Sequence, residues 1–350
     1  MEKVKVISWG LGAMGSGIAK MLTNKKDVEI VGAVDKAPFK IGKDLGEVLK
    51  LGRKMDVEVK SEFKDVIKDN KADIVILAID SFVKNVFPCI KEIVENKMNC
   101  ITIAEEMAYP YEVNKELSEE MDRLAKENGV TILGTGVNPG FVLDTLIITL
   151  SAACRKVESI RASRINDLSP FGLTVMKTQG VGTTKEEFEK GIKNGTIVGH
   201  IGFRQSIPMI AKALGLEIDE IVETREPIIS NTYRETSCVK VEPGMVAGCC
   251  HIAYGKKDGK NIITLEHPQQ IHPQSEGVET GDFIDIKGDS DMHLCINPET
   301  PGGIGTMAMA VNMIPLAVSS RAGLKSMIDL PIPHAIENSF VHQINYYKGE

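Results

Sequence analysis

The sequence predicts an α/β fold: an N-terminal Rossmann domain with a doubly wound parallel sheet, followed by an α+β domain with a mixed, mainly antiparallel sheet. Two observations carry this prediction. Apolar runs of strand length alternate with helical patterns through the first 135 residues, which is typical of a parallel sheet covered by helices. Further along the chain strands dominate and short turns join them. A length of 350 residues also favours two domains over one.

The N-terminal stretch predicts a dinucleotide-binding turn. The apolar run Val4–Trp9 leads into a G-x-G-x-x-G motif at Gly10–Gly15, and a helical pattern follows at once. A second strand, Val28–Val34, ends on Asp35. The motif alone also fits an ordinary glycine-rich turn. Its position between a strand and a helix, with an acid after the next strand, favours a dinucleotide site.

Each glycine of the motif has a separate task. Gly10 permits the tight turn, Gly12 lets a pyrophosphate approach the backbone, and Gly15 lets the helix pack closely on the strand. The helix start presents free N–H groups and a positive dipole end to the phosphates. We therefore expect cofactor contacts from the turn and from the loops that follow neighbouring strands. The expected residues are Gly10, Leu11, Gly12, Ala13, Met14, Gly15, Asp35, Ala78, Asp80 and Glu105.

Asp35 bears on the choice of cofactor. A carboxylate at the end of the second strand accepts hydrogen bonds from the ribose hydroxyls of NAD and repels the 2′-phosphate of NADP. Lys36 and Lys40 lie close by in the sequence and soften that repulsion. The cofactor is therefore NAD or NADP, with NAD favoured by Asp35.

Strand and helix patterns continue in alternation after Asp35. The run Ala72–Ile79 is almost unbroken and apolar, as expected of a central parallel strand buried on both faces. Pro88 must lie near the start of its helix or kink it. The expected strands are Val57–Val59, Ala72–Ile79, Asn99–Ala104 and Val130–Leu133, and the expected helices are Phe63–Lys68, Phe82–Asn96 and Tyr111–Asn128.

The composition changes at Gly134–Asp144, which is rich in glycine, and we place the domain crossing there. We expect a dinucleotide-binding domain over residues 1–138 and a substrate and dimerisation domain over 139–303. Asp258-Gly259 predicts a hairpin turn, and Thr184 with Glu187 predicts a capping box. The expected helices are Thr145–Ala153, Lys185–Lys193 and Phe203–Leu214, and the expected strands are Val157–Ile165, Ile221–Ile229, Val239–Val241, Met245–Tyr254, Ile262–His267, Asp282–Ile286 and His293–Ile296.

The segment Ile304–Leu324 is apolar, rich in small residues and nearly long enough to cross a membrane. Asn312, Pro315 and Arg321 dilute it. We expect a buried helix that returns to the domain junction, so that residues 304–350 form a return helix and tail.

Bulk properties narrow the class of protein. The net charge of −7 argues against a nucleic-acid partner, because binding nucleic acid needs a basic surface. The chain starts directly on a strand pattern, and its seven cysteines are scattered without a C-x-x-C motif. We therefore expect a cytoplasmic protein with reduced thiols and no membrane partner. His267 and His272 are unsuitably spaced for a metal site, so no metal is expected.

Ligands of an open parallel sheet bind beyond the carboxyl ends of its strands. Glu105 and Glu106 follow a strand end, where they suit ammonium binding or base catalysis, or simply form the acidic first turn of a helix. The turn Asn138-Pro139-Gly140 suits substrate contacts or a plain hinge. These alternatives stay open from the residues alone.

The second domain offers two further candidates. His200 lies between Gly199 and Gly202, which favours close approach of a ligand, although a lone histidine is more often structural. Arg164 and Asp167 lie at a strand end together with Arg161 and Asn166, and an arginine there suits bidentate binding of a substrate carboxylate. A surface charge cluster is the alternative.

Several longer motifs resemble the 2,4-diaminopentanoate dehydrogenase family over essentially the whole chain. They are WGLGAMGSG, AEEMAYP, GTGVNPGF, GHIGFRQSI and NMIPLAVSSRAGLKSMIDLP. More distantly, the first domain is similar to the dihydrodipicolinate reductase and meso-diaminopimelate dehydrogenase group. The reductases carry a histidine pair in a catalytic loop, whereas this chain has Lys177–Gly182 and Thr183 in that region.

The resemblance implies oxidative deamination of a small cationic diamino acid to 2-amino-4-oxopentanoate and ammonia, as in ornithine degradation. Glu105, Asn138 and His200 lie on the matching motifs and are the expected catalytic residues. The reaction needs a proton acceptor, and a histidine near its usual pKa suits that task. The resemblance places substrate binding on Asn138, Pro139, Gly140, Arg164, Asp167 and His200. A cyclic-imine reductase and a dinucleotide-binding redox sensor without turnover are the alternatives. The strand-rich second domain further suggests a homodimer through its sheet.

Overall fold

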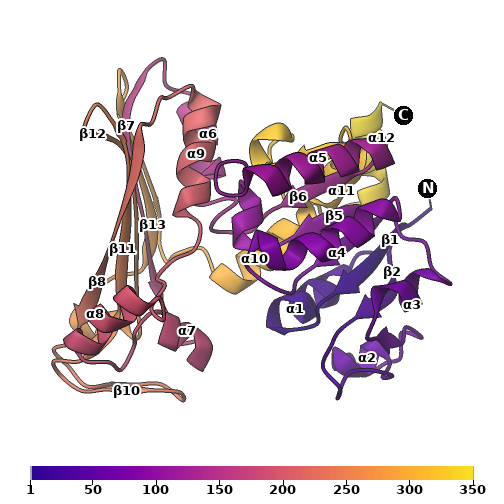
Figure 1. Ribbon diagram of the computed structural model, residues 1–350, viewed down its shortest axis with the longest axis horizontal. Helices are drawn as coiled ribbons and strands as arrows, with labels where there is room; N and C mark the ends of the chain where they lie inside the picture. Colours follow the sequence, from indigo (N-terminus) through magenta and orange to yellow (C-terminus); the bar gives the residue numbers. More distant parts are fainter. Residues whose placement is uncertain (1, 350) are drawn as a thin grey trace. The chain divides into compact units, whose positions relative to one another are not determined.

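The computed structural model describes residues 2–349, and its chain forms two compact units (Figure 1). The first unit combines the chain up to Phe141 with the segment from Pro301 onward. The second unit is the continuous segment Val142–Thr300. The segment after Pro301 therefore belongs to the same unit as the N-terminal strands.

The first unit is built on a seven-stranded parallel sheet with the order β3-β2-β1-β4-β5-β6-β15. Its strands are β1 Val4–Trp9, β2 Val28–Val34, β3 Val59–Lys60, β4 Ile74–Leu77, β5 Asn99–Thr102, β6 Thr131–Gly134 and β15 Gly323–Lys325. The strand succession reverses between β1 and β4. In such sheets the crevice beyond the carboxyl ends of these two strands is where dinucleotides bind. The expected doubly wound parallel sheet is confirmed.

Helices cover this sheet on both faces. Since the crossovers leave β1 in opposite directions, right-handed connections put α1 on one face and α4 and α5 on the other. The helices α3, α4 and α5 share a core with the sheet in which Trp9 stacks on Phe63, with 4.6 Å between ring centroids. The helices are α1 Ala13–Leu22, α2 Leu45–Val48, α3 Phe63–Ile67, α4 Val83–Glu95, α5 Lys115–Asn128, α10 Gly302–Asn312, α11 Ile314–Ser319 and α12 Phe340–Lys348, with short 3₁₀ turns η1 Glu105–Ala108 and η3 Met327–Asp329. Pro88 lies inside α4.

The single return helix expected over Ile304–Leu324 is wrong in detail. The chain forms α10, turns at Met313, forms the short α11 and then adds β15 to the parallel sheet beside β6. Pro315 lacks the N–H that would continue the hydrogen-bond ladder of α10. Gly323, with φ +135°, then leads the chain into β15.

Gly302–Ser319 is apolar and long enough to pass for a membrane span, with a mean hydropathy of 1.4. Within the first unit α10 packs on α1, and α11 packs on β5, β6 and α12. Gly17 of α1 leaves room for the Met307 sulfur, which lies where a Cβ would stand. The end of α10 and most of α11 are therefore buried in the first unit, whereas the start of α10 is not, with Ile304 60% exposed.

The second unit is built on a six-stranded mixed sheet with the order β14-β13-β7-β12-β11-β8. All neighbours are antiparallel except β7 and β12. The strands are β7 Val157–Asp167, β8 Glu220–Ile229, β11 Val246–Lys257, β12 Lys260–Gln270, β13 Gly281–Gly288 and β14 Met292–Ile296, and β9 Arg234–Glu235 pairs separately with β10 Lys240–Val241. The expected mixed, mainly antiparallel sheet is confirmed.

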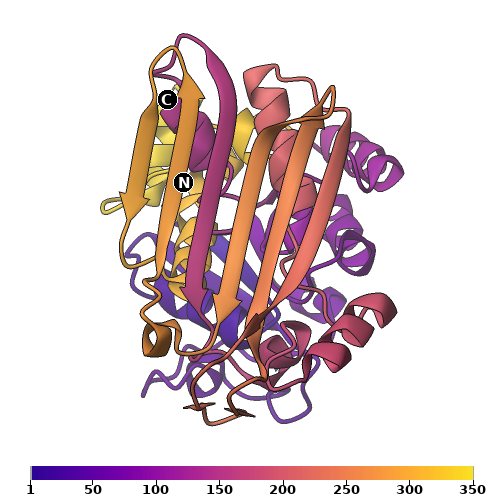
Figure 2. The same ribbon diagram turned by 90° about the vertical axis from the view of Figure 1, so that its left-hand side faces the viewer.

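One face of this sheet carries the helices of the unit, which are α6 Thr145–Ser151, α7 Leu173–Thr178, α8 Lys185–Asn194 and α9 Phe203–Leu214, with a 3₁₀ turn η2 Pro273–Glu276 near the end of β12. Figure 2 shows the opposite face, which no helix of the unit covers. The local signals hold: Thr184 and Glu187 form the capping box, and Asp258 and Gly259 turn between β11 and β12 with φ of 51° and 74°.

Candidate functional site

The glycine motif separates into positions that the fold requires and one that it does not. Gly10 has φ +91°, and a Cβ there would collide with the Ala78 carbonyl oxygen. A Cβ on Gly15 would collide with the Gly10 carbonyl oxygen. Gly12 has an ordinary φ of −66°, and no atom lies within 4 Å of the place its Cβ would take. The space at Gly12, in front of the N-terminus of α1, therefore fits a pyrophosphate.

Asp35 is buried and already holds three donors. Its Oδ2 accepts from the Leu11 N–H at 2.7 Å and from Lys40 Nζ at 3.0 Å, and its Oδ1 accepts from the Ala37 N–H at 2.8 Å. Burial acts to raise the pKa of Asp35, but the hydrogen bonds from Ala37, Lys40 and Leu11 outweigh it and hold the pKa below its ordinary value. The carboxylate is therefore ionised and hydrogen-bonded to the turn Gly10–Gly15, which we call the phosphate turn.

The loops after β4 and β5 distinguish the two adjacent glutamates. Glu106 Oε2 accepts from the Val83 N–H at 2.8 Å, so this carboxylate serves the start of α4. Burial raises the pKa of Glu105 above the ordinary value, although hydrogen bonds from Ser81 and from the backbone of Glu105 itself act to lower it. In the neighbouring loop Asp80 is exposed, and its Oδ1 accepts from the Phe82 N–H. Glu106 therefore has a structural role at the start of α4, and Glu105 is the one of the two that stays a candidate for the site.

The turn that contains Asn138 is compact. Gly140 has φ +122°, and a Cβ there would meet the backbone nitrogen of Gly136 at 2.5 Å. The Val137 N–H donates to Thr306 Oγ1 of α10 at 3.2 Å. Asn138 is partly buried and Pro139 is buried. Close packing of the backbone explains both Gly136 and Gly140 without a ligand. A substrate role for Asn138, Pro139 and Gly140 therefore stays a prediction.

In the second unit His200 belongs to a cluster of three histidines. His251 and His267 stand opposite each other on β11 and β12, and the ring centroid of His200 lies 4.7 Å from that of His267. The His200 N–H donates to His251 Nδ1 at 3.0 Å, and His251 Nε2 lies 3.3 Å from Glu223 Oε2. His251 Nδ1 is therefore an acceptor, which puts the proton of the neutral ring on Nε2, facing Glu223. Phe203 packs against both His200 and His251.

The environment of His200 keeps its ring neutral. Burial, followed by the charges of His251 and Arg164, lowers the pKa of His200 to about 3. Its Nε2 atom is inaccessible and has no hydrogen-bond partner within the chain as described. The expectation of a histidine titrating near its ordinary pKa is therefore wrong. The main cause is burial of the ring, and the charges of His251 on β11 and Arg164 on β7 add to it; neither is visible from the sequence around His200.

Arg164 and Asp167, expected at the substrate, are both committed to structure. Arg164 is buried, pairs with Asp282 at 2.6 Å and donates to the Thr300 carbonyl oxygen, while the Thr300 N–H donates to Asp282. Asp167 Oδ1 accepts from the backbone and hydroxyl of Ser169 and from the His272 N–H. Both terminal nitrogens of Arg164 are occupied, Nη1 by Asp282 and Nη2 by Thr300, so they do not form an open fork for a substrate carboxylate. We therefore withdraw both residues as substrate ligands.

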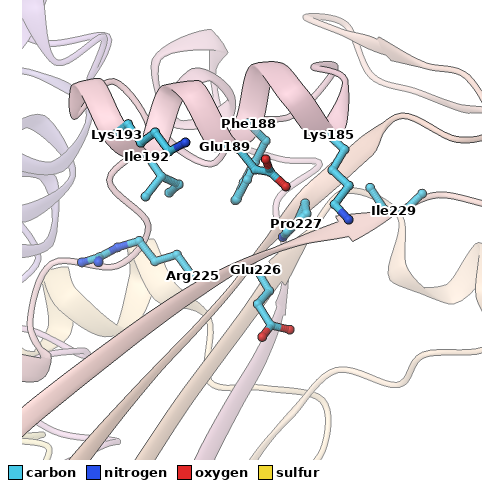
Figure 3. Close-up of a pocket in the computed structure, with 9 residues that line it drawn as sticks. All are labelled: Lys185, Phe188, Glu189, Ile192, Lys193, Arg225, Glu226, Pro227 and Ile229. Carbon is cyan, nitrogen blue, oxygen red and sulfur yellow. The ribbon is translucent and has the colours of Figure 1, made fainter.

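A groove of about 550 Å³ runs between α8 and the edge strand β8 (Figure 3). Phe188, Ile192, Pro227 and Ile229 give it an apolar lining. Lys185 and Lys193 extend from α8 along it, as Figure 3 shows. The lining contains none of the residues that the sequence predicted at the site. Arg225, which also lines it, bonds to Glu223 and so touches the edge of the histidine cluster.

Sequence reasoning missed His251, His267 and Glu223, which lie far from the recognised motifs along the chain. The hairpin at Asp258-Gly259 was a signal that β11 and β12 lie side by side, although not of the register that sets His251 opposite His267. Among residues 2–349 no three His, Cys, Asp or Glu side chains form a metal-binding group.

Two family models match the chain. The model of the 2,4-diaminopentanoate dehydrogenase C-terminal domain matches residues 141–346, which is more than half of the chain. The model of the dihydrodipicolinate reductase N-terminus matches residues 4–102. The second match covers the strands and loops that surround Gly12 and Asp35.

Individual proteins agree with these matches. The chain is 49% identical to 2,4-diaminopentanoate dehydrogenase of Acetoanaerobium sticklandii over 97% of both chains. It resembles the structure of amine dehydrogenase from Mycobacterium smegmatis with a TM-score of 0.84 and 27% identity, covering 96% of this chain and 98% of that one. Dihydrodipicolinate reductase from Paenisporosarcina sp. TG-14, at 14% identity and a TM-score of 0.51 over 93% of this chain and 97% of that one, shares the fold. The chain belongs to the 2,4-diaminopentanoate dehydrogenase family.

Proposed function

We propose that the chain oxidatively deaminates 2,4-diaminopentanoate to 2-amino-4-oxopentanoate and ammonia, with NAD or NADP as oxidant, in the degradation of ornithine. The observation that carries this proposal is the 49% identity, over 97% of both chains, to a relative of that name. The seven-stranded sheet with its open position at Gly12 supplies the nucleotide half of the reaction.

The bound nicotinamide supplies a hydride acceptor. The chain's residues must hold the diamino acid so that the hydrogen on C4 faces it and so that the 4-amino nitrogen has a free lone pair. Loss of hydride from C4 and of one proton from nitrogen leaves an imine. Water then adds to the imine carbon, and breaking of the C–N bond releases ammonia and the ketone. Two protein tasks follow, which are removal of a proton and recognition of a cation.

We assign the proton acceptor to Glu105. A carboxylate takes up a proton near neutral pH only if its pKa is raised, and burial raises the pKa of Glu105. His200, with a pKa of about 3, is unsuited to that task. It stays neutral and offers one buried ring nitrogen for a hydrogen bond. We therefore propose His200, with Asn138, Pro139 and Gly140, as substrate contacts rather than as acid or base.

The cofactor contacts proposed are those of the phosphate turn and its neighbours: Gly10, Leu11, Gly12, Ala13, Met14, Gly15, Asp35, Ala78, Asp80 and Glu105. Asp35 favours NAD. We further propose a cytoplasmic homodimer formed through the uncovered face of the second-unit sheet, with small molecules rather than nucleic acid or membranes as partners. The net charge of −7 supports the last point.

The experiment is a substrate screen on the purified chain. Oxidised cofactor is mixed with 2,4-diaminopentanoate, and both NADH absorbance at 340 nm and released ammonia are recorded. Equal amounts of NADH and ammonia support the proposal. Ornithine, lysine and meso-diaminopimelate serve as competing amines. Turnover of any of these faster than 2,4-diaminopentanoate overturns the substrate assignment.

The second candidate is a reductase of a cyclic imine, favoured by the match of residues 4–102 to the dihydrodipicolinate reductase N-terminus. The test is consumption of NADH or NADPH with a cyclic imine and without ammonia. Activity of that kind, in the absence of ammonia-linked oxidation, selects the reductase. Binding of NADH with neither activity selects a redox sensor.

A further inference from the structure

Lys40 occupies an unusual place for a lysine beside a nucleotide site. Its Nζ lies 3.0 Å from Asp35 Oδ2 and donates to the Leu11 carbonyl oxygen at 2.8 Å. The side chains of Lys40 and Asp35 are only 16% and 10% exposed. The ammonium group therefore bridges the carboxylate and the phosphate turn instead of pointing to solvent.

Lys36, which is closer to Asp35 in the sequence, has a different position. Its side chain is 71% exposed, and its Nζ pairs with Glu62 Oε1 at 2.7 Å. Its charge is thus balanced at the start of α3, whereas that of Lys40 is balanced by Asp35 itself. The chain offers a matched pair of lysines, one at the carboxylate and one turned away from it.

We propose that Lys40 sets the choice between NAD and NADP, by neutralising Asp35 and by donating to the 2′-phosphate of NADP. This inference rests on the proposed function only in that the chain binds a nicotinamide dinucleotide. Asp35 by itself would reject a 2′-phosphate through like charge. Paired with Lys40 it presents no net charge to that phosphate.

The count of donors supports this role. Asp35 Oδ2 already accepts from Leu11 and Lys40, and Oδ1 accepts from Ala37, so few lone pairs remain for the two ribose hydroxyls of NAD. Lys40 uses two of its three ammonium protons, on Asp35 and on Leu11. The Phe39 ring centroid lies 5.5 Å from Nζ, and we assign the third proton to a phosphate oxygen of the bound cofactor. Removing the lysine therefore frees Asp35 for ribose and deprives a 2′-phosphate of the ammonium group beside the carboxylate.

Equilibrium binding tests the proposal without turnover. Trp9, the only tryptophan of the chain, directly precedes Gly10, so energy transfer from tryptophan to the reduced nicotinamide reports binding. The dissociation constants of NADH and NADPH are measured for the wild type, Lys40→Met, Lys40→Arg and Lys36→Met. Thermal unfolding shows that each variant is folded.

Loss of a charge-assisted hydrogen bond to phosphate weakens binding by about 10- to 100-fold, so Lys40→Met is expected to raise the NADPH dissociation constant by that factor. NADH binding is expected to stay the same or to tighten. Lys40→Arg is expected to keep most of the NADPH affinity, and Lys36→Met is expected to leave the NADPH/NADH ratio unchanged. Added salt should weaken NADPH binding to the wild type more than NADH binding, because the extra contact is ionic.

Equal weakening of both cofactors by Lys40→Met overturns the proposal, because Lys40 would then only hold the turn. A changed ratio in Lys36→Met overturns it as well. If Lys40→Met does not fold, the Lys40→Arg ratio and the salt dependence of the wild type decide in its place. Failure of the wild type to bind either cofactor is a separate result, which contradicts the proposed function itself.

Discussion

Gly12 and the glycines beside it show how single residues divide between fold and ligand. Gly10 and Gly15 are required because the Ala78 and Gly10 carbonyls occupy the places of their Cβ atoms. Gly12 has neither a positive φ nor a neighbour within 4 Å. A side chain at Gly12 therefore harms only what binds in front of it.

The first prediction follows from that difference. Gly12→Val is expected to raise the dissociation constant of NADH at least about tenfold, because the side chain fills the pyrophosphate space, and to leave thermal stability nearly unchanged. The matched control is Gly172→Val. Gly172 also precedes a helix with an ordinary φ, −82°, and has open space at its Cβ. Tight NADH binding by Gly12→Val contradicts the placement of the cofactor.

The second prediction concerns the two adjacent glutamates. Glu105→Gln is expected to lower kcat by about 10²–10⁴-fold, the usual cost of losing a positioned acid or base. Glu106→Gln, which alters the start of α4, is expected to lower stability and to change kcat far less.

The pH dependence separates the roles further. A proton acceptor works in its deprotonated form, so kcat of the wild type is expected to fall as pH drops through the raised pKa of Glu105. Glu105→Gln should lose that acid limb. A Glu105→Gln variant with wild-type kcat and an unchanged pH profile rules the residue out as the base.

At the scale of helices and strands, local sequence patterns predict an element correctly where nearby residues in the chain determine its structure. The strands Val4–Trp9 and Val28–Val34 and the helix Phe203–Leu214 have the bounds that the sequence predicts. The capping box of Thr184 forms as expected. The helix and the cap depend on residues within a few positions of one another, so the pattern contains them. The strands are visible as short apolar stretches, although their partners, such as Ile74 for Val6, lie far along the chain.

The histidine cluster shows where such patterns fail. A two-residue hairpin turn at Asp258-Gly259 pairs Lys257 with Lys260, and continuing that register would set His251 opposite Glu266. The register shifts between Gly255 and Lys256, so that His251 faces His267. A one-residue slip moves every later side chain to the other face of the sheet. The pairing of the two histidines therefore depends on a bulge that the hairpin turn does not predict.

The predicted substrate role of Arg164 was wrong for a similar reason, because its partner Asp282 lies 118 residues away in the sequence. Strands β7 and β13 bring the two residues together in register, and the Thr300 N–H donates to Asp282.

The third prediction tests the buried ion pair between Arg164 and Asp282. Asp282→Asn is expected to lower the free energy of unfolding by about 3–5 kcal/mol, because it leaves the buried Arg164 charge uncompensated.

The double variant Arg164→Met with Asp282→Leu provides the control. It removes both charges, so it should cost clearly less than Asp282→Asn alone. Urea unfolding followed by circular dichroism measures both. An Asp282→Asn variant as stable as the wild type would show that the pair contributes little.

At the scale of the whole molecule, the uncovered face of the second-unit sheet defines the expected assembly (Figure 2). It carries half-buried apolar residues such as Ile252, Tyr254 and Phe283 beside the Arg161–Glu266 ion pair. A mixture of apolar and oppositely charged groups suits a symmetric contact between two copies. The sequence predicted a dimer through the sheet from the abundance of strands in the second domain, but it did not show which side chains lie on the uncovered face.

The fourth prediction concerns this assembly. Light scattering during size-exclusion chromatography is expected to give the mass of a dimer for the wild type and of a monomer for Ile252→Lys, because a buried ammonium group opposes the contact. Val113→Lys is the control, since Val113 is 46% exposed on a loop of the first unit. A dimeric Ile252→Lys variant places the contact elsewhere.

The interrupted path of the first unit has a consequence for biosynthesis. A ribosome releases β1 to β6 first, then the whole of Val142–Thr300, and only afterwards α10, α11 and β15. The nascent chain therefore holds β6 as a bare sheet edge, and the surface of β5 and β6 that α11 covers stays open, until the last fifty or so residues emerge. Bare edges and open apolar surface attract other chains. The second unit, encoded later but without interruption, has all its strands before the first unit does, and chaperone demand should fall on the N-terminal half of the nascent chain.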